Sequence, residues 1–238
     1  IAIFVLKDFT FNNVIFGPLR KDFLTYNLLC KLGPAACMGP PDIQLATREF
    51  GEQFFVHMLV SFWLGIIISF PLIVWEIWKF VKPGLYENEK KVTKGIVAVC
   101  SFLFISGVLF GYYVISPFAI SFLGNYTVGM ATINQPTLSS YVNYLTMFTI
   151  PTGLIFELPL GAYFLGKIGI LSSNFLRSYR RHAIVIIFIL AAVVTPPDVV
   201  SQILISIPIL FLYEVSIWVV KGIEKKAITE ESKSLTNV

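Results

Sequence analysis

The chain has too little charge for a water-soluble protein. Only 13% of its 238 residues are charged, whereas soluble globular domains carry about 25%. Hydrophobic residues make up 56% and the mean hydropathy is +0.77, which is too apolar for an intrinsically disordered chain. The composition therefore predicts an integral membrane protein.

The common motifs of enzymes are also missing. The chain contains no His-Glu-x-x-His, Gly-x-Ser-x-Gly, Walker or Gly-x-Gly-x-x-Gly sequence. Its only histidines are His57 and His182, each at the edge of a predicted span, which argues against a metal site. We therefore expect no enzymatic activity, no cofactor and no metal.

Charge-free stretches locate the membrane spans. No charged residue lies between Lys94 and Glu157, or between Glu157 and Lys167. A helix needs about 20 apolar residues to cross a hydrocarbon core of about 30 Å. We predict an all-α, polytopic fold with one membrane domain over 1–238. Its five complete spans are expected at 54–78, 96–120, 141–166, 183–196 and 199–220.

The first residues predict the end of a further span. The chain opens with Ile-Ala-Ile-Phe-Val-Leu, without Met, and turns polar at Lys7. We interpret 1–6 as the end of a truncated first helix and 7–53 as an outer loop. A processed signal peptide is the alternative for this start.

Lys and Arg in the short loops predict the orientation. Most of the 18 basic residues lie in 79–95, 167–182 and the tail 221–238, whereas 121–140 has none. The positive-inside rule then puts 7–53 outside and the C-terminus in the cytoplasm. The net charge of +4 reflects this topology, and we expect no nucleic-acid partner.

Two cysteines lie in the predicted outer loop. Cys30 and Cys37 flank Gly33-Pro34, and an oxidising outer compartment permits a disulfide between them. Two free thiols are the alternative. Cys100 lies within a span and is expected to be a buried apolar residue.

Glu157 is an acid near the middle of a predicted span. A carboxylate there costs about 2.5–3.5 kcal/mol, so it needs a partner, a proton or a wet cavity. Gly153 and Gly161 lie four residues to either side, on the same helical face, and Pro159 predicts a kink. We interpret this stripe as a groove for a partner helix or a proton-handling site. Pairing with another span of the chain is the alternative.

Two further segments combine turns with polar groups. The inner loop places Glu87 and Glu89 among aromatic residues after Pro83-Gly84, a setting in which a carboxylate suits a guanidinium. Asp198 follows Thr195-Pro196-Pro197 and is expected to cap the last helix. Only fourteen residues separate Arg181 from Pro196, which predicts a short, shallow helix pair or local thinning of the bilayer.

These segments together resemble one family. Phe-Val-Lys-Pro-Gly-Leu-Tyr-x-x-Glu-Lys-Lys at 80–91, Phe-Glu-Leu-Pro at 156–159 and Thr-Pro-Pro-Asp-Val-Val-Ser-Gln at 195–202 are similar to signatures of TatC. TatC is the multispanning subunit of the twin-arginine protein translocase. Pro208, Tyr213-Glu214 and Glu52-x-Phe54 add to the resemblance, which covers about residues 50 to 220.

The resemblance implies a receptor for folded proteins with twin-arginine signal peptides, in a bacterial cytoplasmic membrane. It implies that Glu89 meets the arginine pair and that Phe80, Pro83, Leu85 and Tyr86 shape that site. It also implies that Glu157 and Gln202 face single-span TatA- and TatB-like partners, and that the proton-motive force drives transport. A homo-oligomer within the complex and contact with membrane lipid are expected.

The family's N-terminal Leu-x-Glu-Leu-Arg-type motif is not among these residues, so the chain as given is expected to hold half of the recognition site. A proton-coupled secondary transporter that uses Glu157 is the alternative function.

Overall fold

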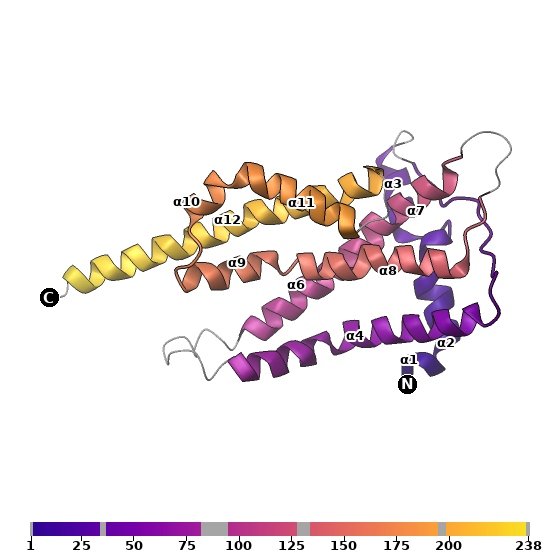
Figure 1. Ribbon diagram of the computed structural model, residues 1–238, viewed down its shortest axis with the longest axis horizontal. Coiled ribbons are helices and arrows are strands. Elements are labelled where there is room, and N and C mark those ends of the chain that lie inside the picture. The colour runs from indigo at the N-terminus through magenta and orange to yellow at the C-terminus, as the bar shows by residue number, and fades with distance from the viewer. Residues whose placement is uncertain (1, 34–36, 82–94, 128–133, 195–198, 237–238) are drawn as a thin grey trace. The chain divides into compact units, whose positions relative to one another are not determined.

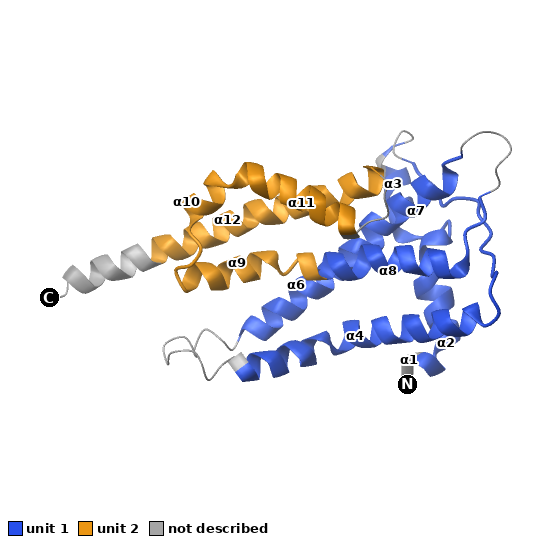
Figure 2. Ribbon diagram, viewed as in Figure 1, with its two compact units in different colours: residues 1–153 blue, residues 154–238 orange. Residues whose placement is uncertain are grey.

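The computed structural model describes residues 2–33, 37–81, 95–127, 134–194 and 199–236. Every regular element in these ranges is a helix (Figure 1), which confirms the predicted all-α class. The chain divides into two compact units, residues 1–153 and 154–238 (Figure 2). In the described ranges, four helical stretches are long and apolar enough to cross a membrane: Glu52–Phe80, Ile96–Asn125, Leu138–Lys167 and Val199–Lys226.

These four stretches contain four of the five predicted spans and extend beyond each. The first is α4 (Glu52–Val81), and the second joins α6 (Ile96–Phe110), the π-helix η5 (Gly111–Ile115) and α7 (Ser116–Asn125). The third comprises α8 (Leu138–Ile155) and α9 (Leu158–Lys167), and the fourth lies in α12 (Val199–Thr236). Residues 183–194 of the remaining predicted span lie in α11 (Arg180–Val194), and its last two residues lie outside the described ranges. With 15 residues, α11 is about 22 Å long and stays shorter than the hydrocarbon core, as its spacing predicts.

Helical structure at the start of the chain continues past the expected end at Leu6. The elements are α1 (Ala2–Val5), α2 (Lys7–Phe9) and the π-helix η1 (Thr10–Ile15), followed by η2 (Gly17–Leu19) and α3 (Leu24–Leu32). Lys7 is exposed, so its charge does not require the helix to end. Ile15 packs with Val56 and Val60 of α4, and this apolar contact favours helix beyond the polar residues.

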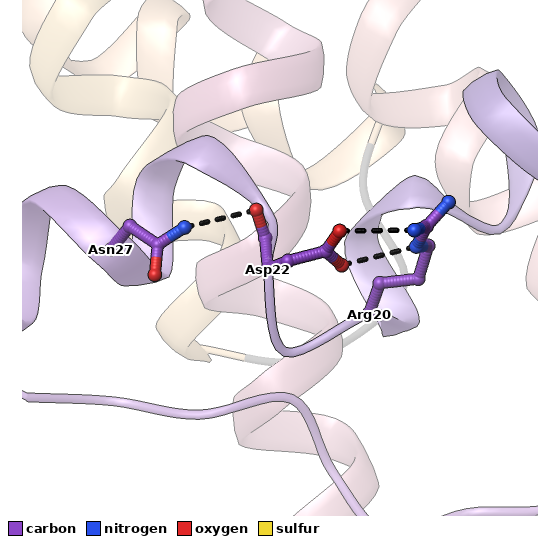
Figure 3. Close-up of polar contacts among 3 residues, drawn as sticks. All are labelled: Arg20, Asp22 and Asn27. Carbon is purple, nitrogen blue, oxygen red and sulfur yellow. Dashed lines mark hydrogen bonds and ion pairs between the residues drawn. The ribbon is translucent and has the colours of Figure 1, made fainter.

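Local polar contacts shape the turn before α3. The Arg20 guanidinium donates to both carboxylate oxygens of Asp22 at 3.0 and 2.9 Å, and Asn27 Nδ2 donates to the Asp22 carbonyl at 3.0 Å (Figure 3). Both charged side chains are at least half exposed. This ion pair therefore orders the turn more than it stabilises the fold.

Tyr26 and a disulfide hold α3 in unit 1. The Tyr26 hydroxyl, in a residue that is only 3% exposed, donates to the Pro18 carbonyl at 2.9 Å. Burial raises the pKa of Tyr26 to about 12, so the hydroxyl keeps its proton at physiological pH. A disulfide joins Cys30 of α3 to Cys37.

A glycine allows two helices of unit 1 to approach closely. A Cβ on Gly111 would lie 2.5 Å from the Phe148 carbonyl oxygen of α8, so only glycine fits there. Gly107, one turn earlier, is also buried. The Gly107-x-x-x-Gly111 sequence is therefore a helix-packing face, a common role of this pattern in membranes.

Glu52 joins the first turns of α4 and α8. Its side chain is buried, and one carboxylate oxygen accepts a hydrogen bond from the Arg48 backbone N–H at 2.8 Å. The other accepts from the Ser139 backbone N–H, also at 2.8 Å. Backbone pairing of Ala46 with Pro136 and Leu138 lies beside it. One carboxylate thus satisfies free N–H groups near the starts of two helices, where negative charge is favoured.

Helix α12 is the centre of unit 2. It packs along α9, and it also contacts α10 (Ser173–Ser178) and α11. Ile217 and Val220 of α12 are fully buried with Ala162 and Leu176. Gly166 lies close to Val220, because a Cβ there would be 3.2 Å from the valine side chain. Unit 2 therefore has its own apolar core around Ile217 and Val220 of α12.

We expect Glu52→Gln to lower the melting temperature of the purified protein in detergent by several degrees. The amide keeps the shape of the side chain but replaces one acceptor oxygen by a donor that faces a backbone N–H. Glu49→Gln removes the same charge from an exposed neighbour and is the matched control. Equal melting temperatures for the two variants would contradict the role assigned to Glu52.

Candidate functional site

The predicted signal-peptide residues begin at the end of α4. The Phe80 side chain is 87% exposed, so no other part of the described chain covers it. Lys79, one residue earlier, lies 3.7 Å from Glu76 in an exposed ion pair of little energetic weight. Pro83, Leu85, Tyr86 and Glu89 lie outside the described residues, and their role stays a prediction.

The helix that carries Glu157 is interrupted at that residue. α8 ends at Ile155 and α9 begins at Leu158, with Pro159 in the first turn of α9. The Glu157 N–H donates to the Leu154 carbonyl at 3.1 Å, and the Glu157 carbonyl accepts from the Gly161 N–H at 2.9 Å. Because proline cannot donate a backbone hydrogen bond, the expected kink takes the form of a two-residue break before Pro159. Both Glu157 carboxylate oxygens are inaccessible to solvent.

The two glycines expected to flank Glu157 have different surroundings. Gly153 is buried in unit 1, where a Cβ would lie 2.7 Å from Val108 and 2.9 Å from Phe104 of α6. Gly161 of α9 has no atom within 4 Å of the same position. The sequence placed both glycines in one groove, but a helix of the same chain fills the space at Gly153. Only Gly161 leaves open surface beside Glu157.

The Gln202 side chain forms a hydrogen bond within unit 2. Its side-chain Nε2 donates to the Phe188 backbone carbonyl at 3.0 Å, which joins the start of α12 to α11. The Ser206 hydroxyl in turn donates to the Gln202 carbonyl at 2.7 Å. The predicted turn formed by Thr195, Pro196, Pro197 and Asp198 lies outside the described residues.

Sequence analysis missed a set of polar contacts that hold α10 and the start of α11 against α12. Glu224 accepts hydrogen bonds from the backbone N–H of Ser173, at 2.8 Å, and from the hydroxyl of the same residue. The Tyr213 hydroxyl donates to the Leu176 carbonyl at 2.7 Å. The 2.7 Å ion pair of Arg180 with Glu214 completes the set. Local sequence gave no signal for these pairs, because their partners are 34 to 51 residues apart.

Unit 1 contains an apolar cavity of about 260 Å³ between membrane-spanning helices. Val60 and Trp63 of α4 line it together with Val108 of α6 and Leu145 of α8. A second cavity, of about 580 Å³, lies between the start of the chain and α4, and its lining includes Lys7, Asp8 and His57. Among the described residues, no three His, Cys, Asp or Glu side chains gather as metal ligands do.

The chain is similar to proteins of one family along most of its length. The family model of the Sec-independent protein translocase protein (TatC) matches residues 1–208. A TatC protein of Blattabacterium from Periplaneta americana is 37% identical, over 92% of this chain and 85% of the relative. A TatC protein of Helicobacter pylori strain J99 is 44% identical, over 71% of this chain and 68% of the relative.

Solved structures agree with the sequence comparison. A crystal structure described as the twin arginine translocase receptor TatC superposes with a TM-score of 0.74 at 28% identity, and the match covers 94% of this chain and 90% of that one. A second structure of the receptor, in the detergent DDM, gives a TM-score of 0.69 at 27% identity, with 91% and 92% covered. The arrangement of helices is therefore shared over nearly the whole chain.

The different surroundings of the two glycines predict different effects of the same substitution. We expect Gly153→Leu to destabilise the purified protein by about 1–3 kcal/mol, the usual effect of an overpacked core. Gly161→Leu should leave stability nearly unchanged, because its side chain enters open space. Thermal unfolding in detergent compares the two, and greater destabilisation by Gly161→Leu would contradict the packing described.

Proposed function

The chain belongs to the TatC family of Sec-independent protein translocase proteins, and we propose that it binds twin-arginine signal peptides and docks single-span partners of the TatA and TatB type. In this proposal it is the receptor subunit for folded cargo, and the proton-motive force drives export. Family membership makes it a multipass membrane protein without enzymatic activity. The carrier alternative has no support from the relatives above, which are protein translocase subunits.

The observation that carries the receptor proposal is the acidic inner-loop signature directly after α4. The chain reads Lys-Pro-Gly-Leu-Tyr-Glu-Asn-Glu from 82 to 89, and α4 carries the exposed Phe80 up to its start. A carboxylate can bind a guanidinium through two parallel hydrogen bonds, which a lysine ammonium cannot reproduce. This difference gives Glu89 a physical basis for preferring arginine in the peptide.

The orientation of the chain fits the same role. Basic residues follow the apolar parts of α9 and α12, and they include Lys167, Arg177, Arg180, Arg181, Lys221, Lys225 and Lys226. By the positive-inside rule these segments, together with the loop that contains Glu89, face the cytoplasm. The signal-peptide site would then open to the compartment in which cargo folds, in the cytoplasmic membrane of a bacterium.

The surface that we propose for partner docking is on α9. Leu158 and Leu165 are exposed on either side of Gly161, and their spacing of three and four residues places all three on one face. A small residue between two leucines lets a second helix approach closely in a membrane. Glu157, one turn before Gly161, is the polar residue proposed for this docking site, and its carboxylate oxygens are inaccessible to solvent. The Gln202 side chain bonds to the Phe188 carbonyl.

We expect an arginine-dependent crosslink close to Glu89. A photoreactive amino acid at position 88 of the full-length protein, in membranes, should label a signal peptide with Arg-Arg far more strongly than one with Lys-Lys. Glu89→Gln should reduce the labelling of the Arg-Arg peptide by tenfold or more, the order expected when one partner of a hydrogen-bonded charge pair is removed. Glu87→Gln is the matched control, and equal labelling of both peptides would refute the role of Glu89.

We expect Gly161→Leu to reduce the amount of TatA- or TatB-like protein that copurifies with the full-length chain. The added side chain would hold the partner helix away from α9. Gly65→Leu is the control, because Gly65 of α4 also has open space around its Cβ position. An equal loss of partner from both variants would remove α9 as the docking surface, while the crosslink at position 88 would be unaffected.

A further inference from the structure

One side of α12 changes along its length from apolar to aromatic to basic. The exposed residues Ile203, Ile207, Phe211, Trp218 and Lys221 follow one another at intervals of three, four or seven. These intervals keep them on one side of the helix. The Trp218 side chain is 77% exposed, which leaves a large aromatic ring uncovered where the apolar part of α12 ends.

The acid on this side of α12 is already neutralised. Glu214, one turn before Trp218, forms the 2.7 Å ion pair with Arg180 at the start of α11. Arg181 is exposed and follows Arg180 directly in α11, so its backbone lies beside the same part of α12. In the part of the chain that the structure describes, the other nearby acid, Glu224, accepts hydrogen bonds from Ser173. Glu224 keeps its negative charge, but Arg181 and Lys221 outnumber it. The surface formed by Arg181, Trp218 and Lys221, here the basic–aromatic patch, therefore has a net positive charge.

We propose that the basic–aromatic patch binds the phosphate headgroup of an anionic phospholipid of the cytoplasmic leaflet. The acyl chains lie along Ile203, Ile207 and Phe211, and the Trp218 ring lies at the level of the ester groups. Lys221 and Arg181 contact the phosphate. Lys221 is three residues beyond Trp218, about 4.5 Å along the axis, so its long side chain reaches the headgroup level.

Apolar, aromatic and basic residues follow one another without a gap on this side of α12, and this order favours a lipid as the occupant. A soluble acidic ligand would not contact the apolar residues that precede Trp218 on this side of α12. An apolar partner helix would leave Arg181 and Lys221 without counterions. Tryptophan is enriched at membrane interfaces, and basic pockets beside membrane-spanning helices bind anionic headgroups. The site requires only that this end of α12 faces the cytoplasm, so it is independent of signal-peptide binding.

Quenching of Trp218 fluorescence by brominated lipids tests the proposal. The full-length protein, with its other tryptophans replaced by Phe, is reconstituted in phosphatidylcholine vesicles that contain brominated phosphatidylglycerol or brominated phosphatidylcholine. We expect the phosphatidylglycerol to quench Trp218 several-fold more efficiently at equal content, because each basic residue near an anionic surface contributes about a five-fold preference.

Variants separate a specific site from general charge. Lys221→Gln with Arg181→Gln should remove most of the preference for phosphatidylglycerol, and Lys221→Arg should retain it. Lys21→Gln with Lys31→Gln makes the same charge change in the predicted outer segment and should have no effect. An unchanged preference in the Lys221→Gln, Arg181→Gln variant, or equal quenching by both lipids in the parent protein, would overturn the proposal. Displacement of the lipid by millimolar glycerol phosphate would overturn the assignment to a membrane lipid.

Discussion

Backbone amides and carbonyls have no water to bond with in a hydrocarbon core, and every other feature of this chain depends on that constraint. It accounts for the helices that fill the charge-free stretches and for the polar groups at their ends. Glu52 satisfies N–H groups near the starts of two helices of unit 1, and Glu224 does the same for α10 in unit 2. These two carboxylates therefore bond to backbone N–H groups near the starts of helices.

The break between α8 and α9 shows how the same constraint can create a functional position. Pro159 cannot donate a hydrogen bond, so the helix is interrupted and Glu157 lies at the interruption. Beyond it, α9 presents Gly161 between two exposed leucines. An open surface with a small residue between two leucines lets another helix approach closely. This arrangement supports a docking role for α9 in the translocase.

The sequence predicted the features that depend on local pattern. Charge-free length located four long helices, and Pro159 predicted a kink close to the break between α8 and α9. The signatures at 80–91, 156–159 and 195–202 identified the family because they lie in specific short segments. The end of the first helix at Leu6 was misplaced, because Lys7 is compatible with a helix whose apolar side continues to Ile15. Polarity along the chain does not reveal which side of a helix is covered.

What the sequence by itself determined is the membrane environment, the helical class and the family, since composition and short motifs carry that information without reference to distant residues. Only the tertiary structure decided which of two equivalent glycines is open. A Cβ on Gly153 would contact Val108 and Phe104, which are 45 or more positions away in the chain, whereas a Cβ on Gly161 would have no neighbour within 4 Å. It likewise decided that Gln202 bonds to Phe188 and that Arg180 neutralises Glu214. Burial and pairing depend on contacts between remote segments, and one segment's pattern cannot specify them.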